Sequence, residues 1–195
     1  MMTSRDKILA AVAASQPETS PLPDINFLIG YETGVLKKFV EILTTIGGRV
    51  YQVNTFEQII SHIKKRLKPG DRAASNISAL AEITAGNNDF TGLPHDLQNV
   101  ELAIIEAQLG VAENGAVWIK EDQSYPRVLP FICQHLAVVL KKEHIVATMH
   151  DAYQKIGAEQ YGFAAFIAGP SKTADIEQSL VLGAHGARTM TVFLI

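Results

Sequence analysis

Residues 166–188 read FIAGPSKTADIEQSLVLGAHGAR, and this stretch carries the pattern that decides the fold. An apolar strand precedes a tight turn at 169–171, and a helix is expected over 173–182, closed by a glycine. The apolar run TMTVFLI at 189–195 then predicts another strand. A strand, a helix and a strand in this order are typical of a parallel α/β sheet.

The same alternation extends toward the N-terminus. Apolar residues at helical spacing predict helices that end at Gly47-Gly48 and at Pro69-Gly70, with a strand RVYQV between them. Further strands are expected at 72–76, 100–108, 116–120, 135–142 and 161–169, and further helices at 77–83 and 145–156. The fold class is therefore α/β, a mostly parallel sheet with helices on both faces.

The first residues predict a separate arm. MMTSRDKILAAVAASQPETS reads as an amphipathic helix with Ser4 as its N-cap, rather than as a signal peptide. Three prolines between Gln16 and Asp24 then favour extended chain. We expect an N-terminal helix and Pro-rich linker at 1–24 and a single α/β domain at 25–195.

Composition excludes several functions. The chain has 195 residues with 17 basic and 20 acidic side chains, so its charge gives no overall basic field for nucleic-acid binding. No window approaches the roughly 18 apolar residues of a membrane span. The single cysteine, Cys133, excludes an intramolecular disulfide and a Cys-type iron–sulfur or zinc site, and a cytoplasmic location is expected. No metal and no cofactor are predicted, and Cys133 is expected to be a buried packing residue.

The turn at 169–171 is the first candidate site. Ligands bind beyond the carboxyl ends of strands in open α/β sheets, and a helix N-terminus suits an anion. Asp175 and Glu177, however, fall in the first turn of the expected helix. Either these acids point away from the ligand, or the ligand presents hydroxyls, amides or a cation. A purely structural role is equally open, with Ser171 or Thr173 as the helix cap.

Two further segments offer reactive side chains. His185 has small neighbours and is expected to be accessible for acid–base chemistry, or to be a surface histidine without a role. Arg188 could bind a carboxylate or be a solvated residue before a strand. Glu113-Asn114-Gly115 is a strong hairpin signal, and Glu113 there could also act as a nucleophile or base.

GPSKTADIEQSLVLGAHGAR resembles the signature of the lactate-utilization protein C family, whose module is the LUD domain, and the resemblance covers roughly residues 70–195. It implies a fold like that of CoA transferases, ribose-5-phosphate isomerase and glucosamine-phosphate isomerase. It also implies a bacterial role in oxidising L-lactate to pyruvate, with iron–sulfur proteins of a lactate-oxidation operon as partners. Two positions depart from the family pattern: Ala187 replaces a usual proline, and Asn114 a common threonine.

The resemblance places ligand binding in the two glycine-containing segments. The residues concerned are Gly169, Ser171, Lys172, Thr173, Asp175, Glu177, Gly186, Arg188 and Asn114, with Glu113 and His185 as catalytic candidates. The ligand would be a small carboxylate or another anion, or else a partner subunit would bind there. Whether the chain turns over a substrate, and whether it forms a homo-oligomer, stay open.

Two other functions are weighed beside this one. Ala-Glu-Asn-Gly at 112–115 is similar to the turn that holds the catalytic glutamate of CoA transferases, so Glu113 could attack an acyl-CoA thioester. A sugar-phosphate isomerase-like enzyme that uses Glu113 belongs to the same alternative. In the third reading the chain is a pure interaction module, in which the motif only shapes the edge of the sheet.

Overall fold

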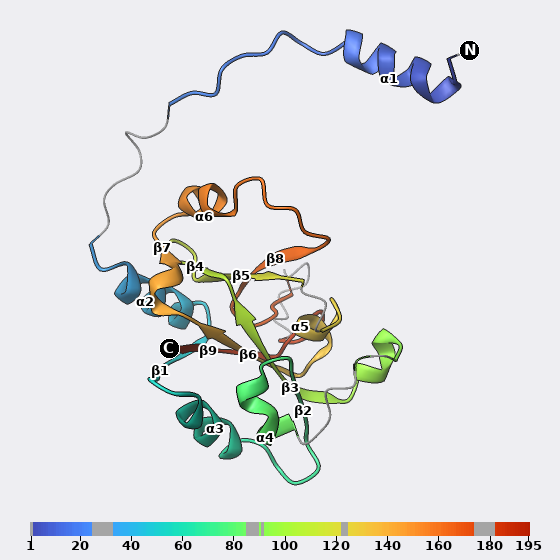
Figure 1. Ribbon diagram of the computed structural model, residues 1–195. Coiled ribbons are helices and arrows are strands. Elements are labelled where there is room, and N and C mark those ends of the chain that lie inside the picture. Colours follow the sequence, from blue (N-terminus) through green and yellow to red (C-terminus); the bar gives the residue numbers. More distant parts are fainter. Residues whose placement is uncertain (1, 25–32, 85–89, 91, 122–124, 174–181) are drawn as a thin grey trace. The chain divides into compact units, whose positions relative to one another are not determined.

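The computed structural model describes residues 2–24, 33–84, 90, 92–121, 125–173 and 182–195 (Figure 1). The chain divides into two compact units, residues 1–31 and residues 32–195. The first contains helix α1 (Ser4–Ala14), whose N-cap is Thr3 rather than the expected Ser4. The Thr3 hydroxyl accepts a hydrogen bond from the Asp6 amide at 3.2 Å, and the Asp6 carboxylate accepts one from the Thr3 amide at 2.9 Å. All residues of α1 are exposed, so its apolar side chains form no core of their own.

The second unit is built on a five-stranded parallel sheet, here called sheet A. Its strands follow the order β1-β9-β6-β3-β2. Their bounds are β1 (Arg49–Gln52), β2 (Arg72–Ser75), β3 (Val100–Ala107), β6 (His135–Leu140) and β9 (Thr189–Leu194). Every neighbouring pair runs parallel, which confirms the fold class expected from the alternation of strands and helices.

A second, four-stranded sheet, here called sheet B, follows from the carboxyl end of β3. Its order is β7-β4-β5-β8, with β4 (Leu109–Val111), β5 (Ala116–Lys120), β7 (Ile145–Val146) and β8 (Ala164–Ala168). β5 pairs antiparallel with both β4 and β8. Strand β8 was expected to be a buried strand like those of the parallel sheet, but it is a half-buried edge strand of sheet B. The short, continuous apolar run of β8 suits either position, so the sequence could not separate them.

Helices cover both faces of sheet A (Figure 1). Helix α3 (Phe56–Lys64) and the residues before α4 (Ala81–Thr84) bury Ile59, Ile63 and Leu80 against one face. Helix α2 (Val35–Thr45), α5 (Leu129–Ile132) and residues of sheet B pack on the other face. Short 3₁₀ turns occupy Ser78–Leu80, Pro94–Leu97 and Lys142–His144.

Helix α6 (Met149–Ile156) packs on sheet B and is shorter than expected. The helix predicted over 145–156 starts four residues late because 145–146 form β7, which pairs with β4. Its start is fixed by Thr148, whose hydroxyl accepts a hydrogen bond from the Asp151 amide at 3.2 Å. The helix predicted over 173–182 falls largely on residues 174–181, outside the described residues, and so do Asp175 and Glu177.

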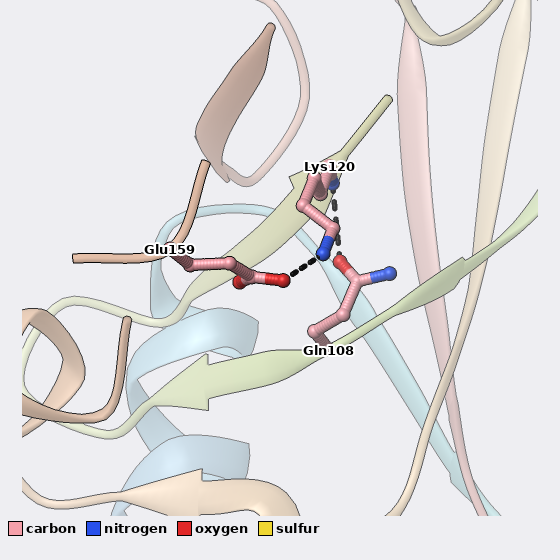
Figure 2. A network of polar contacts seen from close by, with 3 residues as sticks. All are labelled: Gln108, Lys120 and Glu159. Atoms are coloured by element: carbon pink, nitrogen blue, oxygen red, sulfur yellow. Dashed lines mark hydrogen bonds and ion pairs between the residues drawn. The ribbon is translucent and has the colours of Figure 1, made fainter. Parts of the chain in front are cut away.

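A small polar network fastens the outer end of sheet B, at the corner where the chain leaves sheet A (Figure 2). The side-chain oxygen of Gln108 accepts a hydrogen bond from the Lys120 amide at 3.1 Å. The ammonium group of Lys120 forms an ion pair with Glu159, in the connection between α6 and β8. These contacts tie three separate segments of the chain together at the end of β5 that lies away from the Asn-Gly turn.

Cys133 is buried in the core between sheet A and sheet B, with 2% of its surface exposed. Burial raises the pKa of its thiol to about 12, so the thiol stays protonated and unreactive near neutral pH. The expected packing role of Cys133 is thereby confirmed. Among the described residues, no helix is both long and apolar enough to cross a membrane.

Candidate functional site

The two sequence segments singled out above lie side by side at one end of sheet B. Ala116 of β5 pairs with Ala168 of β8 in the antiparallel ladder. The turn at 112–115 directly precedes Ala116, and the turn at 169–171 directly follows Ala168, so the two turns lie at the same end of the ladder. Residues about 55 positions apart in the sequence are thus brought together by a single strand pairing.

Both turns approach the C-terminal end of α2 closely, and both need glycine to do so. Gly115 has φ 68° and Gly169 has φ 73°, conformations that residues with a side chain rarely adopt. A Cβ atom on Gly115 would lie 3.0 Å from the Leu43 backbone, and one on Gly169 would lie 3.1 Å from Cγ1 of Ile46. Ile46 also lies 3.3 Å from the Cβ position of Gly115, so this one side chain supports both turns.

The turn at 169–171 lies at the amino edge of sheet A. The Ser171 amide donates to the Ala187 carbonyl at 2.8 Å, directly before β9, and the Arg188 amide donates to the Gln134 carbonyl at 2.8 Å, directly before β6. Pro170 packs beside Gly47, which precedes β1. The expectation that the turn lies beyond the carboxyl ends of parallel strands is therefore wrong, because the strand before the turn belongs to sheet B.

The surface formed here, which we call the motif surface, comprises residues 169–173 and 182–188. A two-residue antiparallel bridge between Lys172 and Leu182 closes it into one loop, and Gly186 packs against the Ser171 side chain. Lys172, His185 and Arg188 are exposed. Within the described part of the chain, none of these three side chains takes part in an ion pair. Two cations and an imidazole on one loop give a surface suited to an anionic group.

Glu113 points toward a different element. Its carboxylate accepts a hydrogen bond from the Met149 amide, the first residue of α6, at 2.8 Å. Its own amide donates to the Ala147 carbonyl at 3.0 Å. A carboxylate at a helix N-terminus stabilises the helix through the helix dipole and the free amide, so this geometry gives Glu113 a structural use. The side chain is exposed, so its outer oxygen also remains accessible to solvent.

Asn114 completes the turn. Its side-chain oxygen accepts a hydrogen bond from the Ala116 amide at 3.0 Å, which is an Asx-type bond across the tight connection. The hairpin expected from Asn114-Gly115 is confirmed by the antiparallel pairing of β4 and β5. Because this oxygen is engaged in the turn, the side-chain group left for a ligand is the amide nitrogen.

Comparison with known proteins identifies the family of this chain. The LUD domain family matches residues 36–195, which is most of the chain. The chain belongs to the LUD domain family. Its N-terminal arm lies outside the part matched by this family.

Relatives and a solved structure agree with this assignment. The chain is 24% identical to lactate utilization protein C of Oceanobacillus iheyensis, over 98% of each sequence. It is 30% identical to lactate utilization protein C of Bacillus pumilus, over 50% of this chain and 46% of that relative. The crystal structure of a DUF162 family protein from Deinococcus radiodurans superposes with a TM-score of 0.60 at 15% identity, covering 82% of this chain and 95% of the other. This last likeness concerns the fold alone.

In this LUD domain the structure brings the predicted ligand residues into two groups. Gly169, Ser171, Lys172, Gly186 and Arg188 gather on the motif surface. Asn114 and Glu113 lie on the adjoining turn, and the Glu113 carboxylate is directed to α6. Among the described residues, no group of three or more metal-binding side chains comes together.

Sequence reasoning missed the part that α2 plays in this LUD domain. Gly47-Gly48 was interpreted only as the end of a helix, yet Gly47 contacts Pro170 and Ile46 supports both turns. The signal was present in the sequence as an apolar residue directly before a glycine pair. Its partners could not be named, because the contacts join segments more than 60 residues apart.

Proposed function

We propose that this chain is a non-redox component of L-lactate utilization, acting with iron–sulfur partner proteins while L-lactate is oxidised to pyruvate. The observation that carries the proposal is its match to lactate utilization protein C of O. iheyensis, which spans nearly the whole of both sequences. Membership of the LUD domain family supports the same assignment.

The cysteine content is consistent with a system in which other proteins carry the electrons. Oxidation of lactate to pyruvate removes two electrons and two protons, and these electrons need an acceptor. The chain has one cysteine, and that thiol is buried in the core. A Cys-ligated iron–sulfur cluster generally takes four thiolates. In our proposal the clusters therefore belong to the partner proteins, and this chain binds a small carboxylate or a partner subunit.

The motif surface is the region we assign to that binding. Lys172 and Arg188 supply positive charge, and Arg188 can form two parallel hydrogen bonds with a carboxylate. His185 lies between the two glycines that let the loop pack closely on Ser171 and Arg188. A carboxylate of a substrate and a carboxylate of a partner's side chain present the same chemistry to this surface.

Gene deletion tests the proposal. A strain without this gene should fail to grow on L-lactate as the sole carbon source and should grow normally on pyruvate. The wild-type gene should restore growth, and Arg188→Glu and His185→Ala should restore it poorly. His95→Ala is the matched control, because His95 is exposed on a 3₁₀ turn that belongs neither to the motif surface nor to the turn at 112–115. Unchanged growth of the deletion strain on L-lactate would refute the assignment.

Partner binding is tested separately. Affinity purification of the full chain from cells grown on L-lactate should recover proteins whose absorbance spectra and iron content identify iron–sulfur clusters. Arg188→Glu should reduce that recovery, while His95→Ala should not. If the cluster-containing proteins are absent from the wild-type sample, the role with iron–sulfur partners fails.

A second function rests on Glu113, whose accessible carboxylate occupies the Ala-Glu-Asn-Gly turn. We infer from this turn an alternative activity, acyl-CoA transferase-like or sugar-phosphate isomerase-like. Its test is calorimetry with an acyl-CoA and with a sugar phosphate, comparing wild type, Glu113→Gln and Glu113→Ala. Two results would eliminate this alternative. One is that the wild-type chain binds neither ligand, and the other is that Glu113→Ala keeps full transferase or isomerase activity.

A further inference from the structure

A cavity of about 220 Å³ lies at the amino edge of sheet A, on the face covered by α3. It is bounded below by β1, β9, β6 and β3, and above by the end of α3 and the residues that follow it. The motif surface is at the same edge of the sheet but belongs to the side of α2 and sheet B. The cavity is therefore a separate feature.

The register of sheet A explains why there is a space here. Tyr51, Phe193 and Val139 are aligned across β1, β9 and β6, and these large side chains fill the gap beneath α3. Two residues earlier, the aligned row is Arg49, Thr191 and Ala137. The alanine and the threonine in that row have small side chains that fill less of the space beneath the end of α3. A cavity therefore remains there.

The floor carries a polar group with no partner. Thr191 is 7% exposed and lines the cavity. Within the described residues, no hydrogen bond joins its side-chain hydroxyl to another group of the protein. The hydroxyl oxygen is not among the described polar atoms that are fully buried without a partner, so it opens onto the cavity and is free to bond to a group bound there. A ligand in the cavity would supply the missing partner.

The charges around the cavity favour an anion. Arg49 is exposed, stands beside Thr191 in the ladder and has no ion pair among the described residues. Both acids that line the cavity are already engaged. Glu101 lies 3.4 Å from Nε2 of His135, and the Asp71 carboxylate accepts the Lys68 amide at 2.7 Å. The Arg49 guanidinium is therefore available for a negatively charged ligand group.

The inner wall is aromatic. The rings of Tyr51 and His62 lie 4.5 Å apart and those of Tyr51 and Phe193 lie 5.8 Å apart. The Arg66 guanidinium donates to the Tyr51 hydroxyl at 2.7 Å, which fixes the orientation of that ring. The Arg66 guanidinium carbon also lies 5.6 Å from the centroid of the Tyr51 ring. Aromatic rings and aliphatic side chains in the lining suit a planar apolar body more than a fully hydroxylated one.

We propose that this cavity binds a small aromatic carboxylate. The apolar body would lie against Tyr51 and over Ala137, and the carboxylate would bind Arg49 and accept a hydrogen bond from Thr191. The cavity is smaller than the roughly 300–1,000 Å³ of sites for drug-sized ligands, which limits the ligand to about one ring. The proposal is independent of the role in L-lactate utilization.

Calorimetry on the full chain, with benzoate and 4-hydroxybenzoate as probes, tests the proposal. We expect saturable binding of at least one probe with a Kd at or below about 1 mM. L-lactate should bind this site at least about 10-fold more weakly, because it lacks the apolar ring. Failure of both probes to bind, or equal binding of L-lactate, would overturn the assignment.

Three variants locate the binding. Thr191→Val keeps the shape and should weaken binding about 2- to 10-fold, since it removes one hydrogen bond. Arg49→Ala should weaken it about 10-fold or more, since it removes the charge. Lys65→Ala is the matched control, because Lys65 is an exposed cation after α3 that does not line the cavity. Equal losses in Arg49→Ala and Lys65→Ala would indicate unspecific charge attraction and would refute the site.

A fourth variant fills the cavity. Ala137→Leu should abolish binding, because the larger side chain occupies the floor. If this variant fails to fold, Thr191→Val still decides the question. Growth of the deletion strain on L-lactate, complemented with Thr191→Val, should be normal, which separates a failure of this proposal from a failure of the proposed function.

Discussion

The motif surface and the cavity beneath α3 lie at the same edge of one sheet, yet they are built in opposite ways. The motif surface is made by backbone: glycines bring turns onto α2, and the charged side chains point outward. The cavity is made by side chains, with a low floor at Ala137 and Thr191 and an aromatic wall at Tyr51. Short motifs with glycine therefore mark the first region in the sequence, whereas the second depends on strand register.

The largest expected effect tests the backbone construction of the motif surface. Gly115→Ala adds a Cβ 3.0 Å from the Leu43 backbone at a φ of 68°. Strain at positive φ and overpacking together should lower the free energy of unfolding by about 3 kcal/mol, as measured by urea denaturation.

Gly70→Ala is the matched control for Gly115→Ala. Gly70 has φ 94°, but a Cβ there would meet nothing within 4 Å. It should lose only about 1 kcal/mol, from the backbone strain alone. Equal losses at the two positions would show that close packing on α2 does not constrain the turn.

The next effect tests whether the two regions are independent. Ile46→Ala removes the half-buried side chain that supports both turns and should lower the free energy of unfolding by about 1–2 kcal/mol. It should impair complementation on L-lactate while leaving the Kd of the cavity for the aromatic probe unchanged. A parallel change in that Kd would show that the two regions are coupled.

A smaller effect is expected at the outer end of sheet B. Lys120→Met removes the ion pair with Glu159, whose side chains are 25% and 49% exposed, and keeps the aliphatic stem. The loss in unfolding free energy should be about 0.5 kcal/mol and should shrink at high salt. A loss that is independent of salt would assign the effect to packing of the stem.

The smallest effect concerns the floor of the cavity without a ligand. Thr191→Val should change the free energy of unfolding by less than about 0.5 kcal/mol, because no described protein group bonds the hydroxyl. Thermal and urea unfolding of the ligand-free protein provide the measurement. A loss above about 1.5 kcal/mol would reveal a protein partner for the hydroxyl.

Local signals in the sequence predicted much of the fold. Asn114-Gly115 indicated the hairpin, and apolar runs such as HLAVVL indicated the strands of sheet A, because these patterns depend on neighbouring residues alone. The position of the turn at 169–171 was predicted at the wrong edge, since nothing near β8 tells which sheet it joins. Periodicity cannot distinguish a short strand in sheet B from one in sheet A.

The two candidate sites differ in the same respect, since one is marked by a local motif and the other depends on pairing between distant strands. Lys172, His185 and Arg188 were found from the sequence because they sit within one short motif. Arg49, Ala137 and Thr191 were not, because only pairing across β1, β9 and β6 places them in one row. The contact of Arg66 with the Tyr51 hydroxyl likewise required the structure, because it joins α3's C-terminal side to β1.

The order of strands in sheet A sets the order of events during synthesis. β9 lies between β1 and β6, although it follows both of them in the chain by many residues. On the ribosome, β1 cannot be joined to β6 through native pairing until residues 189–194 have left the exit tunnel. The inner edge of β1 therefore stays without its native partner from its synthesis until β9 emerges, and the inner edge of β6 joins it once β6 has been made. Unpaired strand edges of this kind are a state that chaperones have reason to shield.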